Sequence, residues 1–435
     1  MIRSLYSWLM VCLQPLVRRK LRRRALAEPG YGVAVEERFG VYTQTAALPR
    51  SPGTGPLIWV HAVSLGETRA SAALVTALRL AIPGMRLLLT HGTATGRAQG
   101  IGLLAEGDLQ VWQPWDTPSA VERFLTQFHP AIGLLVETEI WPNMVAQCSS
   151  ANVPLCLVNA RLSEKSLAQA QRVAWLARPA YAALSAVWAQ SDADAQRLRV
   201  LGAPVKGVLG NFKFDAEPDA AQVALGQRWR SARGLPVITF AVSREGEEAL
   251  LLAQLHTLRA LRESEPDAFS RCQWMIVPRH PQRFDEVEKL CREQGFSVSR
   301  RSQWGETPAS ADLWLGDTLG EMALYYGLSD VALLGGSFEP LGGQNLIEAL
   351  ACGCPVVMGQ HTFNFAEAAA LAAAAGAAFK VNGIQDAVNQ AMHLALAPQI
   401  RKIASAAGLQ LTAAHQGAAQ RTAVAVRELM VGWSK

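Results

Sequence analysis

Short apolar runs alternate with stretches of helical period along most of the chain. In the first half the apolar runs have the length and composition of buried strands: Leu57–His61, Arg86–Thr90, Ile132–Val136, Pro154–Val158 and Ala186–Ala189. Amphipathic helical patterns lie between them, for example at Glu67–Ala81 and Ser191–Leu201. Alternation of strands and helices in this order is typical of doubly wound α/β units built on a parallel sheet.

The second half repeats this rhythm. Its strand candidates are Val237–Val242, Trp274–Val277, Val331–Leu334 and Pro355–Met358, and the alanine-rich stretch Ala368–Ala378 is expected to form a closely packed helix. Between the halves, Gly207–Asp219 has no helical period and contains Gly and Pro, which favours a linker.

The pattern therefore predicts an α/β protein with two Rossmann-like domains. We expect a membrane-associated apolar and basic segment at 1–24, a first Rossmann-like domain at 25–210, a linker at 211–232, and a second Rossmann-like domain with C-terminal helices at 233–435. The length of 435 residues agrees with two cores.

Composition excludes several other classes of protein. Half of the residues are apolar and 18% are charged, so the chain can bury a large interior and does not resemble a disordered protein. The seven cysteines have no disulfide-framework spacing, and Cys352 and Cys354 lack a second Cys/His pair that would complete a zinc site. We expect reduced, buried thiols.

The net charge of +5 is concentrated at the amino terminus. Residues 1–50 hold nine Lys/Arg against three Glu, a net of +6, which leaves −1 for the remainder. The body of the protein is close to neutral, so the sequence does not predict a nucleic-acid-binding surface over it.

An apolar run at Leu5–Val17 precedes the basic cluster Arg18–Arg24. The run is shorter than the roughly 20 residues of a spanning helix and is interrupted at Pro15. A secretory signal would have the basic cluster first. Tyr6 and Trp8 suit a headgroup layer, and the cations suit anionic lipid, so we expect a shallow anchor on a membrane. The alternative is a helix packed on its own domain with an exposed basic end.

Ligands of open α/β sheets bind beyond the carboxyl ends of strands, so we expect the functional residues to lie just after the strands. After the first strand, Ser64 and Glu67 have the spacing of a capping box. Glu67 is equally a candidate general base, and we expect both roles to hold only if its side chain turns away from the cap.

Two further segments of the first half carry charged candidates. Glu137 and Glu139 follow the third strand beside Trp141, and on a regular extended segment they would share one face; alternatively, they are acids at the start of a helix. Lys213, between two Phe in the linker, is either directed into a cleft between the domains or a solvated linker lysine.

The loops of the second half suit a nucleotide. Ser243–Glu247 starts a helix and could bind an anion, and Arg279 after the next strand could grip a phosphate. Backbone amides near Gly336 and Ser337 and in the Gly342–Glu348 segment could hold phosphate, and the Glu348 carboxylate could bind both hydroxyls of a ribose.

Any one of these loops, taken alone, is more often an ordinary turn or helix cap than a binding site. Their occurrence in order after successive strands is stronger evidence for a nucleotide site. No P-loop motif is present. Asp192-Ala-Asp194 resembles a metal motif of some glycosyltransferases, but acids at a helix start after Ser191 are expected in any case, so we predict no metal there.

Taken together, seven motifs resemble the Kdo (3-deoxy-D-manno-octulosonate) transferases of lipopolysaccharide biosynthesis. They are His61-Ala-x-Ser-x-Gly-Glu67, Glu137-Thr-Glu-Ile-Trp-Pro142, Asn211-Phe-Lys-Phe-Asp215, Pro278-Arg-His-Pro281, Gly335-Gly-Ser337, Asn345-Leu-Ile-Glu348 and Gly359-Gln-His-Thr-Phe-Asn-Phe365. The resemblance implies a GT-B fold, with two Rossmann-like domains facing a central cleft. It implies an inverting enzyme that uses CMP-Kdo, without metal or cofactor, and acts on the tetraacylated lipid A precursor (lipid IVA) at the cytoplasmic face of the inner membrane.

By motif position, the resemblance implies Glu67 as base and Glu137 and Lys213 as stabilisers of the transition state. With Gly336 and Ser337, the implied contacts to CMP are Pro278, Arg279, Leu319, Gly320, Glu321, Asn345, Leu346, Ile347 and Glu348. Arg244 stands where relatives often have His, which leaves the contact there open. The alternatives are another GT-B envelope enzyme that uses a UDP-sugar and a non-catalytic nucleotide-sensing membrane protein of the same fold.

Overall fold

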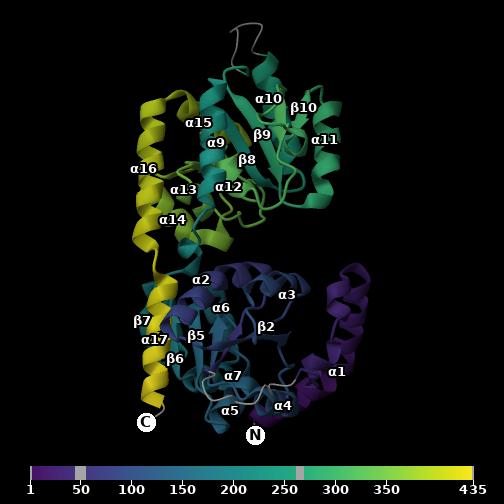
Figure 1. Ribbon diagram of the computed structural model, residues 1–435, viewed down its shortest axis with the longest axis vertical. Coiled ribbons are helices and arrows are strands. Elements are labelled where there is room, and N and C mark those ends of the chain that lie inside the picture. The colour runs from purple at the N-terminus through teal and green to yellow at the C-terminus, as the bar shows by residue number, and fades with distance from the viewer. Residues whose placement is uncertain (1, 45–54, 261–268, 434–435) are drawn as a thin grey trace. The chain divides into compact units, whose positions relative to one another are not determined.

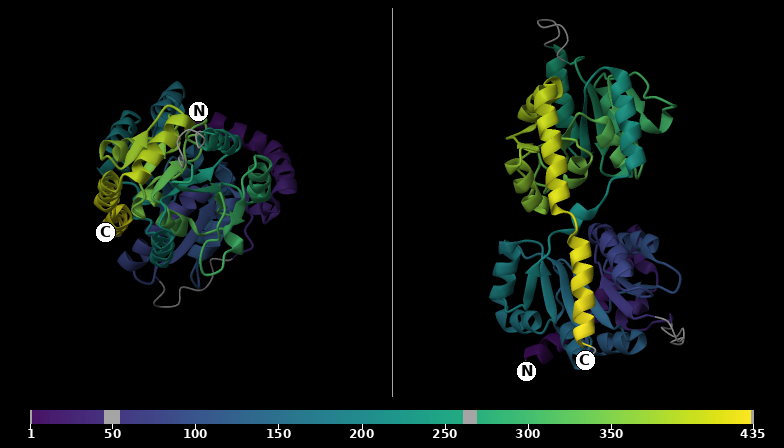
Figure 2. Two further views of the ribbon diagram at one scale, coloured as in Figure 1. Left: turned by 90° about the horizontal axis from the view of Figure 1, so that it is seen from above. Right: turned by 60° about the vertical axis from the view of Figure 1, so that its left-hand side comes forward.

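The computed structural model describes residues 2–44, 55–260 and 269–433, in two compact units (Figure 1). Unit 1 comprises Met1–Asp215 with Gln416–Lys435, and unit 2 comprises Ala216–His415. Among the described residues each unit holds one seven-stranded parallel sheet with helices on its faces (Figure 2). The predicted α/β fold with two Rossmann-like units is confirmed. Arg50, part of the basic amino-terminal region, lies outside the described residues.

The sheet of unit 1 has the strand order β3-β2-β1-β4-β5-β6-β7. The strands are β1 (Leu57–His61), β2 (Arg86–His91), β3 (Leu109–Trp112), β4 (Ile132–Val136), β5 (Leu155–Ala160), β6 (Ala186–Ala189) and β7 (Val205–Val208). The helices are α1 (Ile2–Ala27), α2 (Leu65–Ala81), α3 (Ala94–Gly100), α4 (Pro118–Phe128), α5 (Pro142–Ser150), α6 (Glu164–Arg172), α7 (Ala174–Ala182), α8 (Asp192–Val200) and α17 (Ala418–Trp433). The order reverses between β1 and β4, so the switch point of this sheet lies there.

The sheet of unit 2 has the order β10-β11-β9-β8-β12-β13-β14 and reverses between β8 and β12. Its strands are β8 (Val237–Ser243), β9 (Gln273–Pro278), β10 (Val298–Arg300), β11 (Leu313–Leu315), β12 (Val331–Leu334), β13 (Val356–Met358) and β14 (Ala378–Lys380). The helices are α9 (Ala220–Arg233), α10 (Glu247–Ala260), α11 (Phe284–Glu293), α12 (Met322–Leu328), α13 (Ile347–Ala351), α14 (Ala366–Ala374), α15 (Ile384–Leu396) and α16 (Pro398–His415).

The nine predicted strands are present, with ends shifted by at most two residues. Their side chains are buried on both faces of the sheets, which is why they form continuous apolar runs. The pattern missed β3, β7, β10, β11 and β14, which are short; β10, for example, is only half-buried and carries no apolar run. The predicted helix at Ala368–Ala378 was wrong at its end, because the helix stops at Ala374 and Ala378 starts β14.

The predicted linker at 211–232 was too long. Helix α9 occupies Ala220–Arg233, its first turn is capped by Asp219, and it belongs to unit 2. It crosses α12 so closely that a Cβ on Gly226 would lie 2.3 Å from the carbonyl oxygen of Leu324. Backbone contact of this kind requires glycine, so the residue that weakens the helical pattern is the one that permits the packing.

The predicted assignment of residues 416–435 to the second domain was also wrong. Helix α17, the yellow helix that ends at C in Figure 2, buries Ala418, Ala419, Ala423 and Val426 in the core of unit 1. It packs there on α2. Its first turn is fixed by the carboxylate of Asp215, which accepts the backbone N–H groups of Gly417 (2.6 Å), Ala418 (3.2 Å) and Ala419 (2.6 Å). The chain therefore enters and leaves unit 2 next to one carboxylate of unit 1.

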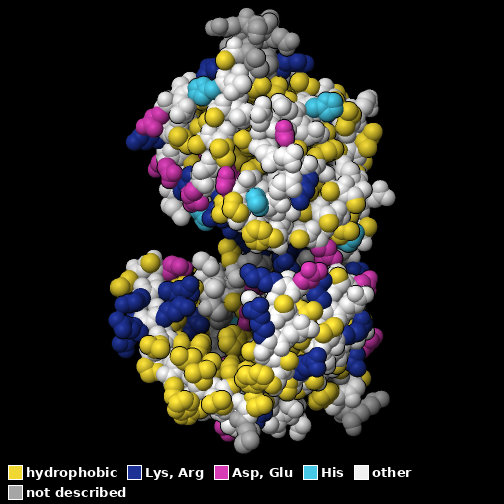
Figure 3. All heavy atoms as spheres, turned by 180° about the vertical axis from the view of Figure 1, so that it is seen from behind, with side chains coloured by type: hydrophobic (Ala, Val, Ile, Leu, Met, Phe, Trp, Pro, Cys, Tyr) yellow, Lys and Arg dark blue, Asp and Glu magenta, His cyan; other side chains and the backbone are white. Residues whose placement is uncertain are grey.

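Helix α1 is one continuous helix through Pro15, and it is packed on unit 1 along one side. Leu21 joins a small core cluster with Tyr31 and Phe39. The other side presents large apolar side chains: Ile2, Leu5, Trp8, Leu9, Val11 and Leu16. Figure 3 shows this apolar patch beside a cluster of Lys and Arg. Among the described residues, no helix is long and apolar enough to cross a bilayer.

Tyr6 does not lie on the exposed side of α1. Its hydroxyl donates a hydrogen bond to Asp116 (2.8 Å), so the ring predicted to sit among headgroups is directed into the protein. Trp8, two residues on, is 65% exposed. The packed-helix alternative is therefore confirmed for one side of α1, and the membrane anchor stays a prediction for the other side. Of the cysteines, Cys12 on α1 is exposed, contrary to the expectation of buried thiols, and the others are buried and free.

Candidate functional site

The charged candidates of unit 1 meet at its switch point. Glu67 follows β1 and Glu137 follows β4, the two strands between which the order reverses. Lys213 lies on a 3-10 helix, η4 (Phe212–Asp215), after β7, and its Nζ is 3.1 Å from Oε1 of Glu137. Both side chains of this ion pair are largely buried. The sequence placed these residues after separate strands, and the fold brings them together.

Glu67 completes a reciprocal capping box. Its Oε2 accepts the Val63 N–H (2.8 Å), its Oε1 accepts the Ser64 hydroxyl (2.9 Å), and its own N–H donates to Ser64 (3.4 Å). The side chain thus stays in the cap, contrary to the expectation that it would have to turn away. A carboxylate has about four acceptor positions and these bonds use two, so the cap orients the group without consuming it.

The pKa of Glu67 is raised to about 7. Burial is the largest cause, and the charges of Glu137 and Glu139 add to it, against the hydrogen bonds from Val63 and Ser64. A carboxylate in this range is divided between its protonated and ionised forms near neutral pH. Such a group is suited to accept a proton during a reaction.

Residues 137–141, which we term the acidic loop, begin with a backbone outlier. Glu137 has φ +65°, which is uncommon outside glycine and costs free energy, so the chain turns where a regular strand would continue. Glu137 reaches Lys213, whereas Glu139 accepts the indole N–H of Trp141 (2.7 Å). The two acids therefore have different partners, although both charges act on Glu67.

The loops of unit 2 after β8 and β12 are tied together by Glu247. This fully buried carboxylate accepts the N–H groups of Gly336 (2.7 Å), Arg244 (3.0 Å) and Phe338 (3.3 Å). Burial raises its pKa, against these hydrogen bonds. A second outlier lies beside it, because Val242 has φ +59° at the end of β8 and its carbonyl oxygen would be 2.2 Å from a Cβ on Gly335.

Glu248 performs the same task for the loop after β9. It is also fully buried, accepts the Ser243 hydroxyl (2.8 Å) and pairs with Arg283 (2.8 Å), at the far end of the Pro278–Arg283 loop. Sequence reasoning did not single out Glu248 or Arg283. The signal in the sequence was the pair Glu247 and Glu248 at the start of the helix after β8, because two acids are unexpected in a segment predicted to bind anions.

Several predicted nucleotide contacts are engaged within the protein. The Gly336 N–H donates to Glu247, and the buried Ser337 hydroxyl donates to Leu334 and accepts the Gly359 N–H (2.9 Å). Leu346 and Ile347 are buried, and Asn345 donates to Glu348 (3.1 Å). These groups shape the loop, while the half-buried Asn345, Glu348 and Arg279 lie nearer to solvent.

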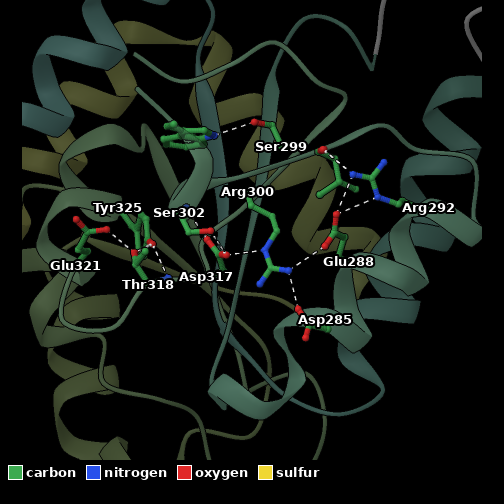
Figure 4. A network of polar contacts seen from close by, with 12 residues as sticks. Asp285, Glu288, Arg292, Ser299, Arg300, Ser302, Asp317, Thr318, Glu321 and Tyr325 are labelled. Carbon is green, nitrogen blue, oxygen red and sulfur yellow. Dashed lines mark hydrogen bonds and ion pairs between the residues drawn. The ribbon is translucent and has the colours of Figure 1, made fainter. Parts of the chain in front are cut away.

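The Gly316–Glu321 loop is held by a network of ion pairs, seen in Figure 4. Arg300 pairs with Asp317 (2.6 Å), Asp285 (2.6 Å) and Glu288 (3.1 Å). Burial opposes ionisation of Asp317, but its hydrogen bonds from Ser302 and Arg300 lower the pKa of its carboxyl.

The predicted contacts at the tip of this loop lie in different settings. Glu321 pairs with Arg301 (2.9 Å) and with the Thr318 hydroxyl, so its carboxylate is already engaged. Leu319 is 75% exposed, and Gly320 has φ +78°. Leu319 and Gly320 are the exposed residues of this loop, between Thr318, whose N–H donates to the Tyr325 hydroxyl (3.3 Å), and Glu321.

Two other predicted positions are accounted for. Pro278 is the buried last residue of β9, and Arg244 is half-buried with its side chain 3.3 Å from Glu245.

Asp194, in the segment that resembles a metal motif, accepts the Ser191 hydroxyl (2.6 Å) and the Leu162 N–H (2.9 Å) and pairs with Arg197, as a capping acid does. The described residues contain no cluster of three or more His, Cys, Asp or Glu that could hold a metal ion.

Known proteins resemble this chain in fold and in sequence. A glycosyltransferase from Rickettsia africae has a TM-score of 0.56 at 12% identity and covers 87% of this chain and 99% of its own. A putative UDP-N-acetylglucosamine 2-epimerase from Listeria monocytogenes has a TM-score of 0.56 at 14% identity, covering 86% and 97%. At such identities these two structures show the fold alone, which is of the GT-B type.

The sequence comparisons go further. The family model of 3-deoxy-D-manno-octulosonic-acid transferases matches residues 34–216. The 3-deoxy-D-manno-octulosonic acid transferase of Bordetella pertussis is 44% identical over 433 residues, covering 98% of this chain and 99% of that protein. That of Haemophilus influenzae is 30% identical over 428 residues, covering 97% of each. The chain therefore belongs to the family of 3-deoxy-D-manno-octulosonic acid transferases and is a glycosyltransferase.

Proposed function

We propose that this protein transfers Kdo, with inversion, from CMP-Kdo to a hydroxyl of lipid IVA at the cytoplasmic face of the inner membrane. The observation that carries the proposal is the group at the switch point of unit 1: a carboxylate with a pKa of about 7 beside a buried Glu–Lys ion pair. Family membership supplies the reaction class. The rest of the proposal concerns which residues act.

In this scheme Glu67 is the general base. The acceptor hydroxyl oxygen attacks the anomeric carbon of Kdo, its proton passes to Glu67, and the bond from that carbon to the CMP phosphate oxygen breaks with its electron pair on CMP. The anomeric carbon gains positive character as CMP leaves, and Glu137 and Lys213 stabilise the changing charge. A positioned general base typically contributes about 10²–10⁴ in rate.

Unit 2 is proposed to bind the donor at its own switch point. The loops after β8, β9 and β12 converge there, held by Glu247 and Glu248. Arg279 and backbone amides near residue 345 would bind the phosphate, and Glu348 the ribose hydroxyls. Pro278, the backbone at 319–321 and the 345–348 turn would enclose the cytidine.

No step of the scheme uses a metal, so transfer is expected to continue in EDTA. A loss of activity in EDTA that Mg²⁺ restores would contradict this.

The exposed side of α1 is proposed to dock on the membrane that holds the acceptor. It combines large apolar side chains with the exposed cations Arg19, Lys20, Arg22 and Arg23. Burial of the apolar side chains in the bilayer surface would contribute hydrophobic free energy to binding, and the cations would attract anionic lipid. A lipid substrate would then be presented to unit 1 from a surface to which the enzyme is already bound.

The deciding experiment is mass spectrometry of the product from purified protein, CMP-Kdo and lipid IVA. We expect a mass increase of one or more Kdo units. Protection against thermal unfolding separates the alternatives: protection by CMP and not UDP supports the proposal, whereas protection by UDP alone indicates a UDP-sugar enzyme. Binding of CMP without any transfer would favour a nucleotide sensor.

A further inference from the structure

Helix α1 is joined to the interior of unit 1 by polar contacts on its packed side. Tyr6 donates to Oδ2 of Asp116 (2.8 Å). The Ser7 hydroxyl lies 2.8 Å both from Oδ1 of Asn143 and from the Arg3 carbonyl of its own helix, so its one proton is shared between these two acceptors. The indole of Trp115 donates to the carbonyl of Met10 (3.0 Å). Asp116 and Asn143 are 0% and 2% exposed, so the acceptor residue of each of the first two contacts is buried.

The same two residues fix the first turn of α5. Asp116 accepts the N–H groups of Asn143 (3.1 Å) and Met144 (2.8 Å), and its carbonyl accepts the Asn143 side-chain amide (2.7 Å). Helix α5 begins at Pro142, directly after the acidic loop. One carboxylate thus holds both the amino-terminal helix and the end of the loop that carries Glu137 and Glu139.

Aromatic packing reinforces this connection. The Trp115 ring packs against Trp141 with 6.4 Å between ring centroids, and Trp141 donates to Glu139. Glu137, at the start of the loop, has the strained φ of +65° and is held in turn by Lys213. A backbone that stores strain needs support from its surroundings, and the loop has it at both ends.

We propose that Tyr6 and Ser7 are positioning residues, which act through Asp116 and Asn143 to hold the acidic loop in its place beside Glu67. The inference rests on the proposed function, since it takes this loop as part of the transfer site. Helix α1 then has two separate tasks: its exposed side docks on the membrane, and its packed side supports the chemistry.

The electrostatics of Glu67 supply a readout that is specific to loop position. Burial has the largest effect on its carboxylate and raises the pKa; the charges of Glu137 and Glu139 raise it further, and the Val63 N–H and Ser64 hydroxyl lower it. A loop that relaxes away from Glu67 removes repulsion, so the pKa of Glu67 falls. Loss of stability alone would reduce the amount of folded enzyme and leave the pH profile of the rest unchanged.

The test is Tyr6→Phe in the full chain, assayed on detergent-dispersed lipid IVA with CMP-Kdo. We expect kcat to fall roughly tenfold, because small misplacements at a reacting centre are costly. The KM for CMP-Kdo should change little, and the acid limb of the kcat–pH profile should move to lower pH. Binding to anionic phosphatidylglycerol vesicles should stay unchanged, since Tyr6 is turned inward. Ser4→Ala, which removes a hydroxyl from an exposed position of the same helix, should behave as wild type.

Asp116→Asn provides a second arm. It should lower kcat in the same way, and adding Tyr6→Phe should cost little more, because the two residues share one contact. Wild-type kcat and pH profile in Tyr6→Phe would overturn the inference, as would a tenfold loss in Ser4→Ala. Absence of transfer by the wild-type protein would instead reject the proposed function. If Asp116→Asn does not fold, Tyr6→Phe decides alone.

Discussion

At the scale of single residues, the candidate site depends on carboxylates that have partners but keep acceptor positions. Glu67 is held by a cap and its pKa is raised to about 7 mainly by burial. Glu247, by contrast, is fully buried and uses its oxygens on three backbone N–H groups. Glu67 retains access to solvent and so suits proton transfer, whereas Glu247 suits support of a loop.

Glu67→Gln should abolish most transfer and preserve the fold. Glutamine can still accept the Val63 N–H, as in capping boxes that use it, but cannot take a proton. We expect kcat to fall about 10²-fold or more. In the wild type, kcat should rise with pH through about 7 as Glu67 ionises, and this limb should be lost in the variant. Retention of more than about a tenth of the rate would show that Glu67 is only a cap.

Glu348→Ala should weaken CMP binding. A carboxylate that bonds ribose hydroxyls is worth about 1.5–3 kcal/mol, so the Kd measured by calorimetry should rise at least tenfold. Asp192→Ala removes an exposed carboxylate from unit 1 and is the control, with an unchanged Kd expected. Equal affinity of Glu348→Ala and wild type would remove Glu348 from the proposed donor site.

At the scale of elements, helix α1 is packed on unit 1 along one side and exposes large apolar side chains along the other. Its apolar residues do not form a single stripe against unit 1, and the exposed ones lie beside the cations of its second half. Arg18 is already paired with Glu36 and stacked on Phe39 at 3.7 Å, so it contributes less to an outer surface than its neighbours. Removing α1 as a whole would take the Tyr6 hydroxyl from Asp116 and the Met10 carbonyl from Trp115, so substitutions on the exposed side are the cleaner test.

Arg19→Gln with Arg23→Gln should reduce binding to anionic vesicles. Each cation near such a surface is worth about 1 kcal/mol, so at low salt the affinity should fall roughly tenfold to thirtyfold. The difference should shrink in high salt, where the Debye length is short. Arg199→Gln with Lys206→Gln removes the same charge from other exposed positions of unit 1. If sedimentation with vesicles shows equal losses for both pairs, the cluster has no special role.

At the scale of the whole molecule, the chain makes two α/β units and then returns to the first. Asp215 marks the place where it leaves unit 1 and caps the helix with which it comes back. Helix α17 completes the core of unit 1 over α2, so the stability of the unit that carries Glu67 depends on the last residues of the chain.

Val426→Ala should therefore destabilise unit 1. Removing two buried methyl groups and leaving a cavity costs roughly 1–3 kcal/mol. Hydrogen exchange should show loss of protection in α2, with little change in the sheet of unit 2. Val431→Ala, on the same helix at a position that is 59% exposed, should cost far less. Loss of protection confined to unit 2 would contradict the assignment of α17.

The sequence alone determined the strands buried on both faces, the presence of two α/β units and the motifs at strand ends, because these are encoded in local periodicity and in short contiguous segments. The places where it failed are places where distant segments meet. Three features depend on partners far along the chain: the packing of α17 in the core of unit 1, the backbone contact of Gly226 with α12, and the inward direction of the Tyr6 side chain. The meeting of Glu67, Glu137 and Lys213 depends on strand order, since local pattern specifies that a strand forms but not which strand lies beside it.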